Sequence, residues 1–454
     1  MSNAIKSLLA LGIAATVAML VPESELLDPA ARRAVFILVF AALLWMTDAM
    51  PAYSVGILII GLKLLLLGKA GGVYATTTRD WEEFVAVLGH PLVWLFFGGF
   101  VLAAGMAATG IDRWLANRIL KRFGGSTGQL LIGLMLTTFG LSMIMSNTAT
   151  TAMMLAILAP LLLNKKGSAT AKALVLGIAV AANLGGMGSL IGTPPNAIAV
   201  GSLMEVTDGP QIGFLDWIIL GLPPALLLLG LAFMMIRLSY KLDDEPLVMP
   251  EQKIRNVVIP RWQSVTVVMT LITTVALWLT SEWHRAPTAV ISFIPIVMFT
   301  TTGILTTQLI RGLPYDVLFM LAGGLALGQT VSDTGLSLWI ANLLPVGDLS
   351  QVLVILFFAY LTVLLSNFMS NTAAATVLIP ISITVAEAFP GAIAVTVALA
   401  ASAAMLLPVA TPPNAMAFAT GHLQSRDFLR LGVIIGLVAP PVFIAWLGIV
   451  LVFL

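Results

Sequence analysis

Two short polar motifs each occur twice in a chain that is otherwise strongly apolar. Ser146-Asn147-Thr148 recurs as Ser370-Asn371-Thr372, and Thr193-Pro194-Pro195-Asn196 recurs as Thr411-Pro412-Pro413-Asn414. At membrane depth, polar residues and helix-breaking prolines leave backbone groups without partners, which is costly unless the groups line a cavity or bind a ligand. Interruptions at corresponding places in two halves of a membrane protein indicate a transport site.

A Ser-Asn-Thr motif at the tip of a helical hairpin can bind charges of both signs. The start of the following helix offers free N–H groups and about half a positive charge to an anion. Free carbonyl groups at the end of the preceding helix, together with Ser and Asn oxygens, suit a hard cation such as Na⁺. Ser142 and Ser366 lie one helical turn before Ser146 and Ser370, so each half offers the same oxygen set.

The Thr-Pro-Pro-Asn motifs are expected to form the facing wall of the same site. Proline lacks an N–H, so it leaves the carbonyl oxygen one turn earlier free for a ligand. We therefore count Thr193, Pro194, Thr411 and Pro412 among the substrate-binding residues.

The composition places these motifs in a membrane protein. Of the 454 residues, 59% are hydrophobic and 9% are charged, whereas about a quarter are charged in soluble domains. The apolar runs last about 17 to 25 residues, which is the length of a membrane-spanning helix. We predict an all-α polytopic membrane protein with about eleven transmembrane helices and two re-entrant hairpins.

The hairpins are assigned to segments 127–163 and 350–388. Each segment is long enough for two passes but has a Ser-Asn-Thr motif at its middle, which favours a re-entrant hairpin. The crossings are predicted near 5–21, 34–50, 52–68, 91–110, 173–205, 212–236, 263–281, 287–303, 314–333, 392–420 and 431–454.

The distribution of Lys and Arg predicts the orientation. With the N-terminus in the cytoplasm, most of the 22 basic residues fall in inner loops, and outer loops contain only Arg32, Arg33, Lys69, Arg79 and Arg285. The positive-inside rule therefore predicts an inner (plasma) membrane protein with a cytoplasmic N-terminus and a C-terminus outside. The basic residues gather on no single face, so nothing indicates a nucleic-acid partner.

The two halves match each other in register. Gly98-Gly99 and Gly323-Gly324 correspond, and the basic stretch 111–125 corresponds to 336–350, which has no basic residue. This charge difference, with an odd number of spans per repeat, predicts two inverted-topology repeats. The predicted regions are an N-terminal helix and outer loop (1–33), the first repeat (34–236), a charged cytoplasmic linker (237–262) and the second repeat (263–454).

These residues resemble a known family, the divalent anion/sodium symporters, also called the dicarboxylate transporter or INDY family. The matching strings are "SNTATTAMMLAILAP" and "IGTPPNAIAV" in the first half, and "SNTAAATVLIP" and "LPVATPPNAMAF" in the second. The resemblance covers nearly the whole chain, including "TDAMP" at 47–51, where the family commonly has Glu in place of Asp48. It implies a homodimer in the lipid membrane, in which hairpins and broken helices slide against a scaffold in an elevator motion.

The resemblance also implies roles for single residues. The residues that would contact substrate carboxylates are Asn147, Thr148, Asn371 and Thr372. Two sodium sites are implied, one per half: Ser142, Ser146 and Asn147 with a carbonyl near Gly192, and Ser366, Ser370 and Asn371 with a carbonyl near Ala410.

Two charged residues beside or within predicted spans are expected to be structural. Lys63 is expected to snorkel or to pair locally. Asp48, next to Met50-Pro51 at a predicted helix boundary, is expected to cap a helix or to form a pair.

The expected function is sodium-coupled import of C4-dicarboxylates such as succinate, malate or fumarate. The alternatives on the same fold are a dicarboxylate/citrate anion exchanger and a sodium/sulfate symporter. Sodium coupling is preferred because no Lys or Arg lies close in sequence to either motif to replace the charge of a cation. An intramembrane enzyme is disfavoured because the predicted core has neither Cys nor a His cluster, and paired broken helices favour alternating access over a channel.

Overall fold

The computed structural model describes residues 2–21, 30–68, 77, 79–123, 125–162, 167–206, 209–240, 242, 260–343, 349–386 and 388–453. These residues form helices, and they contain no strand. Most of the predicted linker 237–262 and most of the loop before 33 lie outside the described residues. Within the described part, six helical stretches are long and apolar enough to cross a membrane: Asn3–Leu20, Trp81–Thr109, Ala169–Met187, Phe214–Ser239, Arg261–Leu279 and Ser425–Val450.

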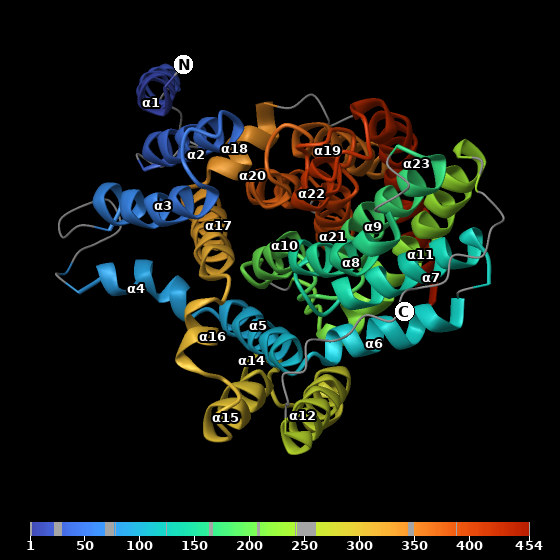
Figure 1. Cartoon of the computed structure of the whole chain (residues 1–454). Coiled ribbons are helices and arrows are strands. Elements are labelled where there is room, and N and C mark those ends of the chain that lie inside the picture. The colour runs from blue at the N-terminus through green and yellow to red at the C-terminus, as the bar shows by residue number, and fades with distance from the viewer. Residues whose placement is uncertain are drawn as a thin grey trace.

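The helices follow one another along the chain as labelled in Figure 1. They are α1 (Asn3–Leu20), α2 (Ala31–Met46), α3 (Ala52–Leu66), α4 (Trp81–Val85), α5 (Pro91–Thr109), α6 (Ile111–Leu120), α7 (Thr127–Ser142), α8 (Asn147–Leu162), α9 (Ala169–Met187), α10 (Pro194–Met204), α11 (Phe214–Ser239), α12 (Arg261–Leu279), α13 (Ser281–His284), α14 (Thr288–Ile291), α15 (Phe293–Thr301), α16 (Thr307–Arg311), α17 (Tyr315–Asp333), α18 (Leu336–Leu343), α19 (Gln351–Ser366), α20 (Asn371–Val385), α21 (Pro390–Ser402), α22 (Pro412–Ala419) and α23 (Ser425–Phe453). Two 3₁₀ turns, Ala86–Gly89 and Lys121–Phe123, complete the described helical structure.

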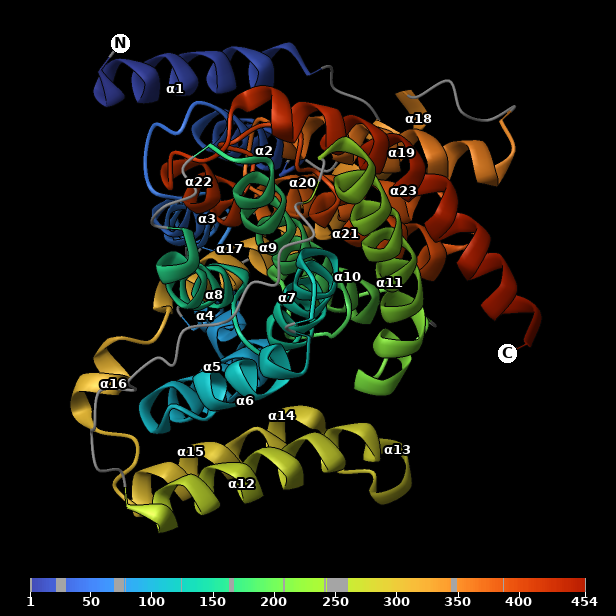
Figure 2. The same cartoon turned by 45° about the vertical axis from the view of Figure 1, so that its right-hand side comes forward.

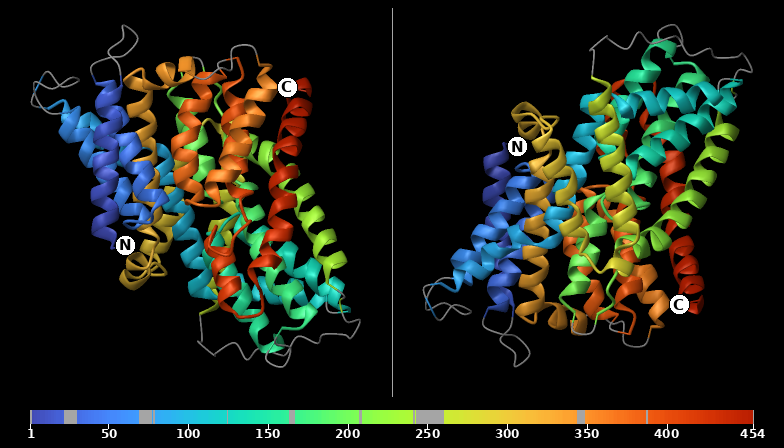
Figure 3. Two further views of the ribbon diagram at one scale, coloured as in Figure 1. Left: turned by 90° about the horizontal axis from the view of Figure 1, so that it is seen from above. Right: turned by 90° about the horizontal axis from the view of Figure 1, so that it is seen from below.

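The helices pack as two groups. The flanking group comprises α1–α5 and α12–α17, in which α12, α14 and α15 pack against α5 (Figure 2). The broken-helix group comprises α7–α11 and α19–α23. Views from above and below place α1–α3 on one side of the molecule and α11 with α23 on the other (Figure 3). The two groups meet mainly where α17 packs against α10 and α20.

The flanking group is held together by a close contact between α3 and α17. Gly56 of α3 faces Gly323 of α17, and a Cβ on Gly56 would lie 2.6 Å from the carbonyl oxygen of Phe319. A Cβ on Gly323 would overlap the backbone of Gly56. Glycine at both positions therefore allows the two backbones to touch, as small residues do between membrane helices.

We expect Gly323→Val to destabilise the protein by about 3 kcal/mol, because its side chain would force α3 and α17 apart. The measurement is the apparent melting temperature of the purified protein in detergent. Gly61→Ala is the matched control, since Gly61 lies on α3 with open space around its Cβ position. Equal melting temperatures for Gly323→Val and wild type would contradict this account of the contact.

Each segment assigned to a hairpin consists of two helices that meet at its Ser-Asn-Thr motif. In the first, α7 ends at Ser142 and α8 begins at Asn147. In the second, α19 ends at Ser366 and α20 begins at Asn371. The polar motif thus stands at a junction where the backbone leaves the helical conformation.

The Thr-Pro-Pro-Asn motifs interrupt two of the predicted crossings. The span near 173–205 is divided into α9 and α10, and the span near 392–420 into α21 and α22. Pro194 and Pro412 are the first residues of α10 and α22, where a missing N–H costs no helical hydrogen bond. The predicted span 287–303 is likewise divided, at Ser292, into α14 and α15.

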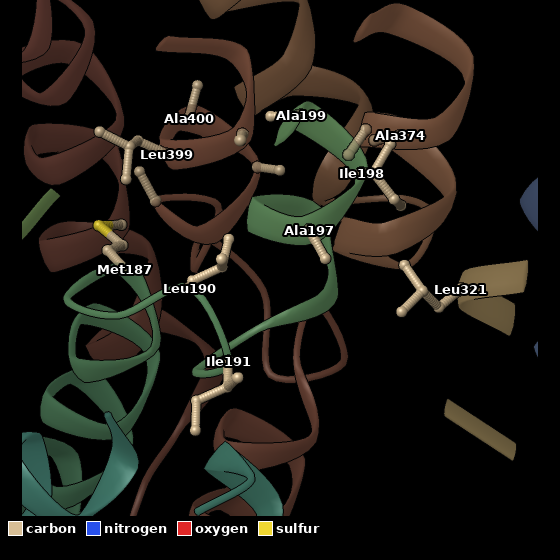
Figure 4. Packing of buried hydrophobic residues seen from close by; sticks show 14 of the residues in the cluster. Met187, Leu190, Ile191, Ala197, Ile198, Ala199, Leu321, Ala374, Leu399 and Ala400 are labelled. Carbon is tan, nitrogen blue, oxygen red and sulfur yellow. The ribbon is translucent and has the colours of Figure 1, made fainter. Parts of the chain in front are cut away.

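The short second helix of each broken pair packs against the other half of the chain. Figure 4 shows Ile198 of α10 near Ala374 of α20, and α10 also packs against α21, whose Leu399 and Ala400 are fully buried like Ile198 and Ala374. In the same way α22 packs against α8 and α9. The two interruptions are therefore brought together at the centre of the molecule.

Candidate functional site

A cavity of about 670 Å³ lies where the interruptions meet. All of the residues predicted to bind substrate line it: Asn147, Thr148, Thr193, Pro194, Asn371, Thr372, Thr411 and Pro412. The predicted sodium ligands Ser146, Gly192, Ser370 and Ala410 also line it. Ser142 and Ser366 do not, because both are fully buried.

Four helices begin at the wall of this cavity. They are α8, α10, α20 and α22, whose first residues Asn147, Pro194, Asn371 and Pro412 all line it. Each helix start carries about half a positive charge, so together they favour an anion in the cavity. Each half of the chain thus contributes one Ser-Asn-Thr helix start and one Pro-Pro helix start to the cavity wall.

Only two of these four helix starts offer N–H groups. Ser146 Oγ and Ser370 Oγ cap α8 and α20 by accepting from N–H groups of Ala149 and Ala373 at 3.2 Å. The first two residues of each of these helices have backbone N–H groups that donate to no described residue. They are Asn147 and Thr148 in α8, and Asn371 and Thr372 in α20. The starts of α10 and α22 are prolines and have no N–H to donate. The helix-start N–H groups free to bind an anion are therefore those of the Ser-Asn-Thr helices, and Thr193 and Thr411 add hydroxyl groups on the same wall.

Behind each Ser-Asn-Thr tip, three oxygen atoms meet. Ser142 Oγ lies 2.7 Å from Asn147 Oδ1 and 2.8 Å from the carbonyl oxygen of Ala182. The second half repeats these contacts at 2.8 and 3.0 Å with Ser366, Asn371 and Ala401. One hydroxyl hydrogen can serve only one of its two acceptors at a time, so each cluster has an oxygen to spare. Neutral oxygens gathered in this way are the ligands of a hard cation.

The loops before Pro194 and Pro412 add unpaired carbonyl oxygens. Neither the carbonyl of Gly192 nor that of Ala410 accepts a hydrogen bond from a described residue. A Cβ on Gly192 would lie 2.5 Å from the carbonyl oxygen of Gly186, so only glycine fits there. Both carbonyls are at the positions where the family resemblance implies cation ligands.

Two buried asparagines hold these loops in shape. The side-chain N–H groups of Asn196 and Asn414 each donate to two loop carbonyls: Gly186 (2.9 Å) and Ser189 (2.7 Å), and Met405 (3.2 Å) and Leu407 (3.0 Å). Ser189 Oγ in turn donates to the carbonyl of Met143, which ties the first loop to the α7–α8 junction. The fourth residue of each Thr-Pro-Pro-Asn motif thus positions the site instead of lining it.

Asn183 is a cavity residue that no duplicated motif marks. Its Nδ2 donates to Oδ1 of Asn414 at 3.1 Å and so joins the two halves. The position that corresponds to it, directly after Ala401, is Ser402. Because the second half has no asparagine at this position, the comparison of the two halves could not identify Asn183. The remaining signal in the sequence was an isolated polar residue within the apolar α9.

Most of the remaining cavity wall is apolar, and it includes Trp45, Phe96, Phe100 and Phe368. Among the described residues that line the cavity there is no Lys, Arg or His, and Asp48 is the one charged residue. The expected cap or pair for Asp48 is not seen within the described part of the chain, where its carboxylate has no hydrogen bond or ion pair.

Lys63 forms a chain of contacts away from this cavity. It is 4% exposed, and its Nζ donates to Oε1 of Gln329 at 3.2 Å, while Gln329 Nε2 donates to Oε1 of Glu205 at 3.1 Å. Lys63 belongs to α3, Gln329 to α17, and Glu205 directly follows α10, so Lys63 forms contacts across the fold and not locally. Glu205 and Gln329 line a second cavity of about 460 Å³.

Comparison with known proteins agrees with this geometry. A family model described as citrate transporter matches residues 38–405. A protein of Staphylococcus saprophyticus named sodium-dependent dicarboxylate transporter SdcS is 31% identical over 92% of this chain and 86% of its own. Proteins of the same name from Staphylococcus aureus are 30% identical over 88% of this chain and 82% of theirs.

Two solved transporter structures share the fold. The Alcanivorax borkumensis YdaH transporter aligns with a TM-score of 0.58 at 13% identity, over 89% of this chain and 99% of its own. The Neisseria gonorrhoeae efflux pump MtrF aligns with a TM-score of 0.54 at 11% identity, over 87% of this chain and 94% of its own. The helical fold, the family match and the extent of the similarity together show that this chain belongs to the citrate transporter family, and that it is a multi-pass membrane transporter and not an enzyme.

Proposed function

We propose that the protein imports C4-dicarboxylates together with sodium ions. The observation that carries the proposal is the composition of the 670 Å³ cavity, in which free helix-start N–H groups stand in front of spare oxygen atoms and no basic residue is present. An anion held without a basic residue needs its charge balanced by bound cations. The names of the staphylococcal relatives support both the sodium and the dicarboxylate.

Each Ser-Asn-Thr tip is proposed to bind one carboxylate. The N–H groups and side chains of Asn147 and Thr148 would hold one end of the substrate, and those of Asn371 and Thr372 the other. Two tips facing one cavity suit a short molecule with a carboxylate at each end, such as succinate, malate or fumarate. Thr193, Pro194, Thr411 and Pro412 would form the surrounding wall.

Two sodium ions are proposed, one behind each tip. The first would lie among oxygens of Ser142, Ser146 and Asn147 and the carbonyl of Gly192, and the second among the matching atoms of Ser366, Ser370, Asn371 and Ala410. The oxygen clusters that include the carbonyls of Ala182 and Ala401 support these positions. Moving a dianion into a negative cell interior costs about 4.6 kcal/mol per 100 mV. Two sodium ions would neutralise that charge, so the sodium gradient would drive uptake.

The transport cycle is proposed to be an elevator motion in a homodimer in the inner (plasma) membrane, with the N-terminus in the cytoplasm and the C-terminus outside. The α7–α8 and α19–α20 pairs would be re-entrant hairpins of two inverted repeats, and the broken-helix group would slide against the flanking group. The recurrence of the same contacts at Ser142 and Ser366 supports the repeats.

The hydrogen bonds that connect Lys63, Gln329 and Glu205 would close the end of the molecule opposite the cavity. Val317, near the start of α17, lines the cavity, and Gln329 lies ~18 Å further along the same helix. The link from Gln329 to Glu205 joins the flanking group to α10. It would have to break when the two groups slide.

Glu205→Ala is therefore expected to depopulate this conformation several-fold. The chain has no cysteine, so a single Val409→Cys reporter, 79% exposed at the cavity, can be labelled with a thiol reagent. Labelling should slow in Glu205→Ala and stay unchanged in Glu83→Ala, which removes an exposed carboxylate from α4. An unchanged labelling rate in Glu205→Ala would show that the contact does not hold the closed end.

The function is tested by uptake of labelled succinate into proteoliposomes with and without an inward sodium gradient, and with internal succinate as a counter-substrate. Uptake that requires sodium and no internal substrate would establish symport. Uptake that ignores sodium and requires internal substrate would make the protein an exchanger. With neither, labelled citrate and sulfate are the next substrates, because the family model is described as citrate transporter.

A further inference from the structure

The turn between α2 and α3 holds a carboxylate at a backbone position that favours glycine. Asp48 has a φ of 48°, and the backbone bonds from Asp48 N–H to Trp45 (3.3 Å) and from Ala49 N–H to Leu44 (3.2 Å) close the end of α2. These are the two bonds of a Schellman motif, in which glycine is the usual left-handed residue and Asn an occasional one. The backbone alone gives no reason for Asp at this position.

The Asp48 side chain is exposed at the cavity. It forms no hydrogen bond or ion pair with a described residue. Lys6 Nζ donates to the carbonyl of Thr47 at 2.8 Å, and thus to the backbone of the turn. With no partner in the described part of the chain, this carboxylate can act on whatever occupies the cavity.

We propose that Asp48 is a specificity-determining residue that disfavours anions with a third negative charge. This inference rests on the proposed function, since it concerns the anion held by the two Ser-Asn-Thr tips. Once two carboxylates of a substrate are bound by the tips, a third must face the remaining wall. That wall consists largely of apolar side chains, Trp45, Phe96 and Phe100 among them, and its one charge is the negative charge of Asp48.

The selection follows from charge and not from shape. A tricarboxylate would meet no basic partner among the residues that line the cavity, and its additional charge would be repelled by the exposed carboxylate of Asp48. A dicarboxylate would leave that part of the wall empty. One charge pair across such a cavity corresponds to a discrimination on the order of tenfold.

The test compares two anions that differ by one carboxylate. Glutarate and tricarballylate share the same five-carbon chain, and tricarballylate has a third carboxyl group on its middle carbon. Each competes with labelled succinate for uptake into proteoliposomes at mildly alkaline pH, where all carboxyl groups are ionised. The quantity measured is the ratio of their inhibition constants, in wild type and in Asp48→Asn, Asp48→Gly and Asp48→Glu.

We expect Asp48→Asn and Asp48→Gly to improve tricarballylate inhibition about tenfold relative to glutarate, while Asp48→Glu keeps the wild-type ratio. Asn and Gly both tolerate the left-handed backbone, so the variants should fold. Glu83→Gln removes an exposed charge away from the cavity and serves as the control.

An unchanged ratio in both neutral variants would overturn the proposal. An unchanged ratio with a lower Hill slope for sodium would also overturn it and would assign Asp48 to a further cation site instead. The experiment distinguishes failure of the proposed function from failure of the proposed role of Asp48. If wild type takes up no dicarboxylate, the proposed function fails before any variant is compared; if it does, the inhibition ratios test Asp48 alone.

Discussion

Asn147→Ala and Asn371→Ala are each expected to lower kcat/KM for dicarboxylate uptake by about a hundredfold or more. Each asparagine stands at a helix start on the cavity wall, and its Oδ1 completes the oxygen cluster behind the tip. Alanine removes both a contact to the substrate and a ligand of the proposed cation. Initial uptake rates over a range of succinate and sodium concentrations would measure both losses.

Folding should survive these two substitutions. Without the asparagine, Ser142 Oγ can still donate to the carbonyl of Ala182, and Ser366 Oγ to that of Ala401, so no buried hydroxyl is left alone. The melting temperature and the oligomeric state should therefore match wild type. Asn117→Ala, in α6 and outside the cavity lining, is the control for an asparagine without this role. Wild-type transport by both variants would refute the assignment of the site.

Asn414→Ala is expected to impair stability as well as transport. The fully buried side chain holds the carbonyls of Met405 and Leu407 and accepts from Nδ2 of Asn183. Alanine would leave these groups without partners in the protein interior, at a cost of about 3 kcal/mol. The loop before Pro412 would lose its shape, and the carbonyl of Ala410 its position. A lower apparent melting temperature and a loss of uptake are expected together.

A double-mutant cycle with Asn183 identifies the cross-half bond. If the two asparagines stabilise each other, the destabilisation by Asn183→Ala and Asn414→Ala combined should be smaller than the sum of the two single effects. Asn342→Ala is the matched control, because Asn342 is exposed on α18. Strict additivity would mean that the Asn183 contact contributes nothing to holding the halves together.

The type of each major element could be predicted from the sequence because long apolar runs in a membrane protein have few alternatives to helix. The prolines at 194 and 412 also marked where α10 and α22 begin, since proline fits the first turn of a helix. The division of 287–303 at Ser292 was missed, although Pro295 lacks the N–H that would bond the carbonyl of Ile291 in a continuous helix. The packing of α3 on α17 could not be predicted, because it depends on two glycines far apart in the chain.

The candidate site divides in the same way. Its polar side chains were visible because duplication separates them from the apolar background, and all eight residues predicted to bind substrate line one cavity. The carbonyls of Ala182 and Ala401 were not visible, because every residue has a carbonyl and only the fold decides which one is left at the cation cluster. Asn183 was missed because its role depends on Asn414, which only the fold brings next to it.

The sequence by itself determined the class of the protein, the duplicated motifs and the residue types that hold anion and cation, because hydrophobicity, helix breaking and oxygen chemistry are properties of local sequence. Only the tertiary structure decided that four helix starts share one cavity, that two of them keep free N–H groups, and that Asp48 is the single charge on the cavity wall. Those properties depend on distances between residues that are remote in the chain, and packing sets such distances.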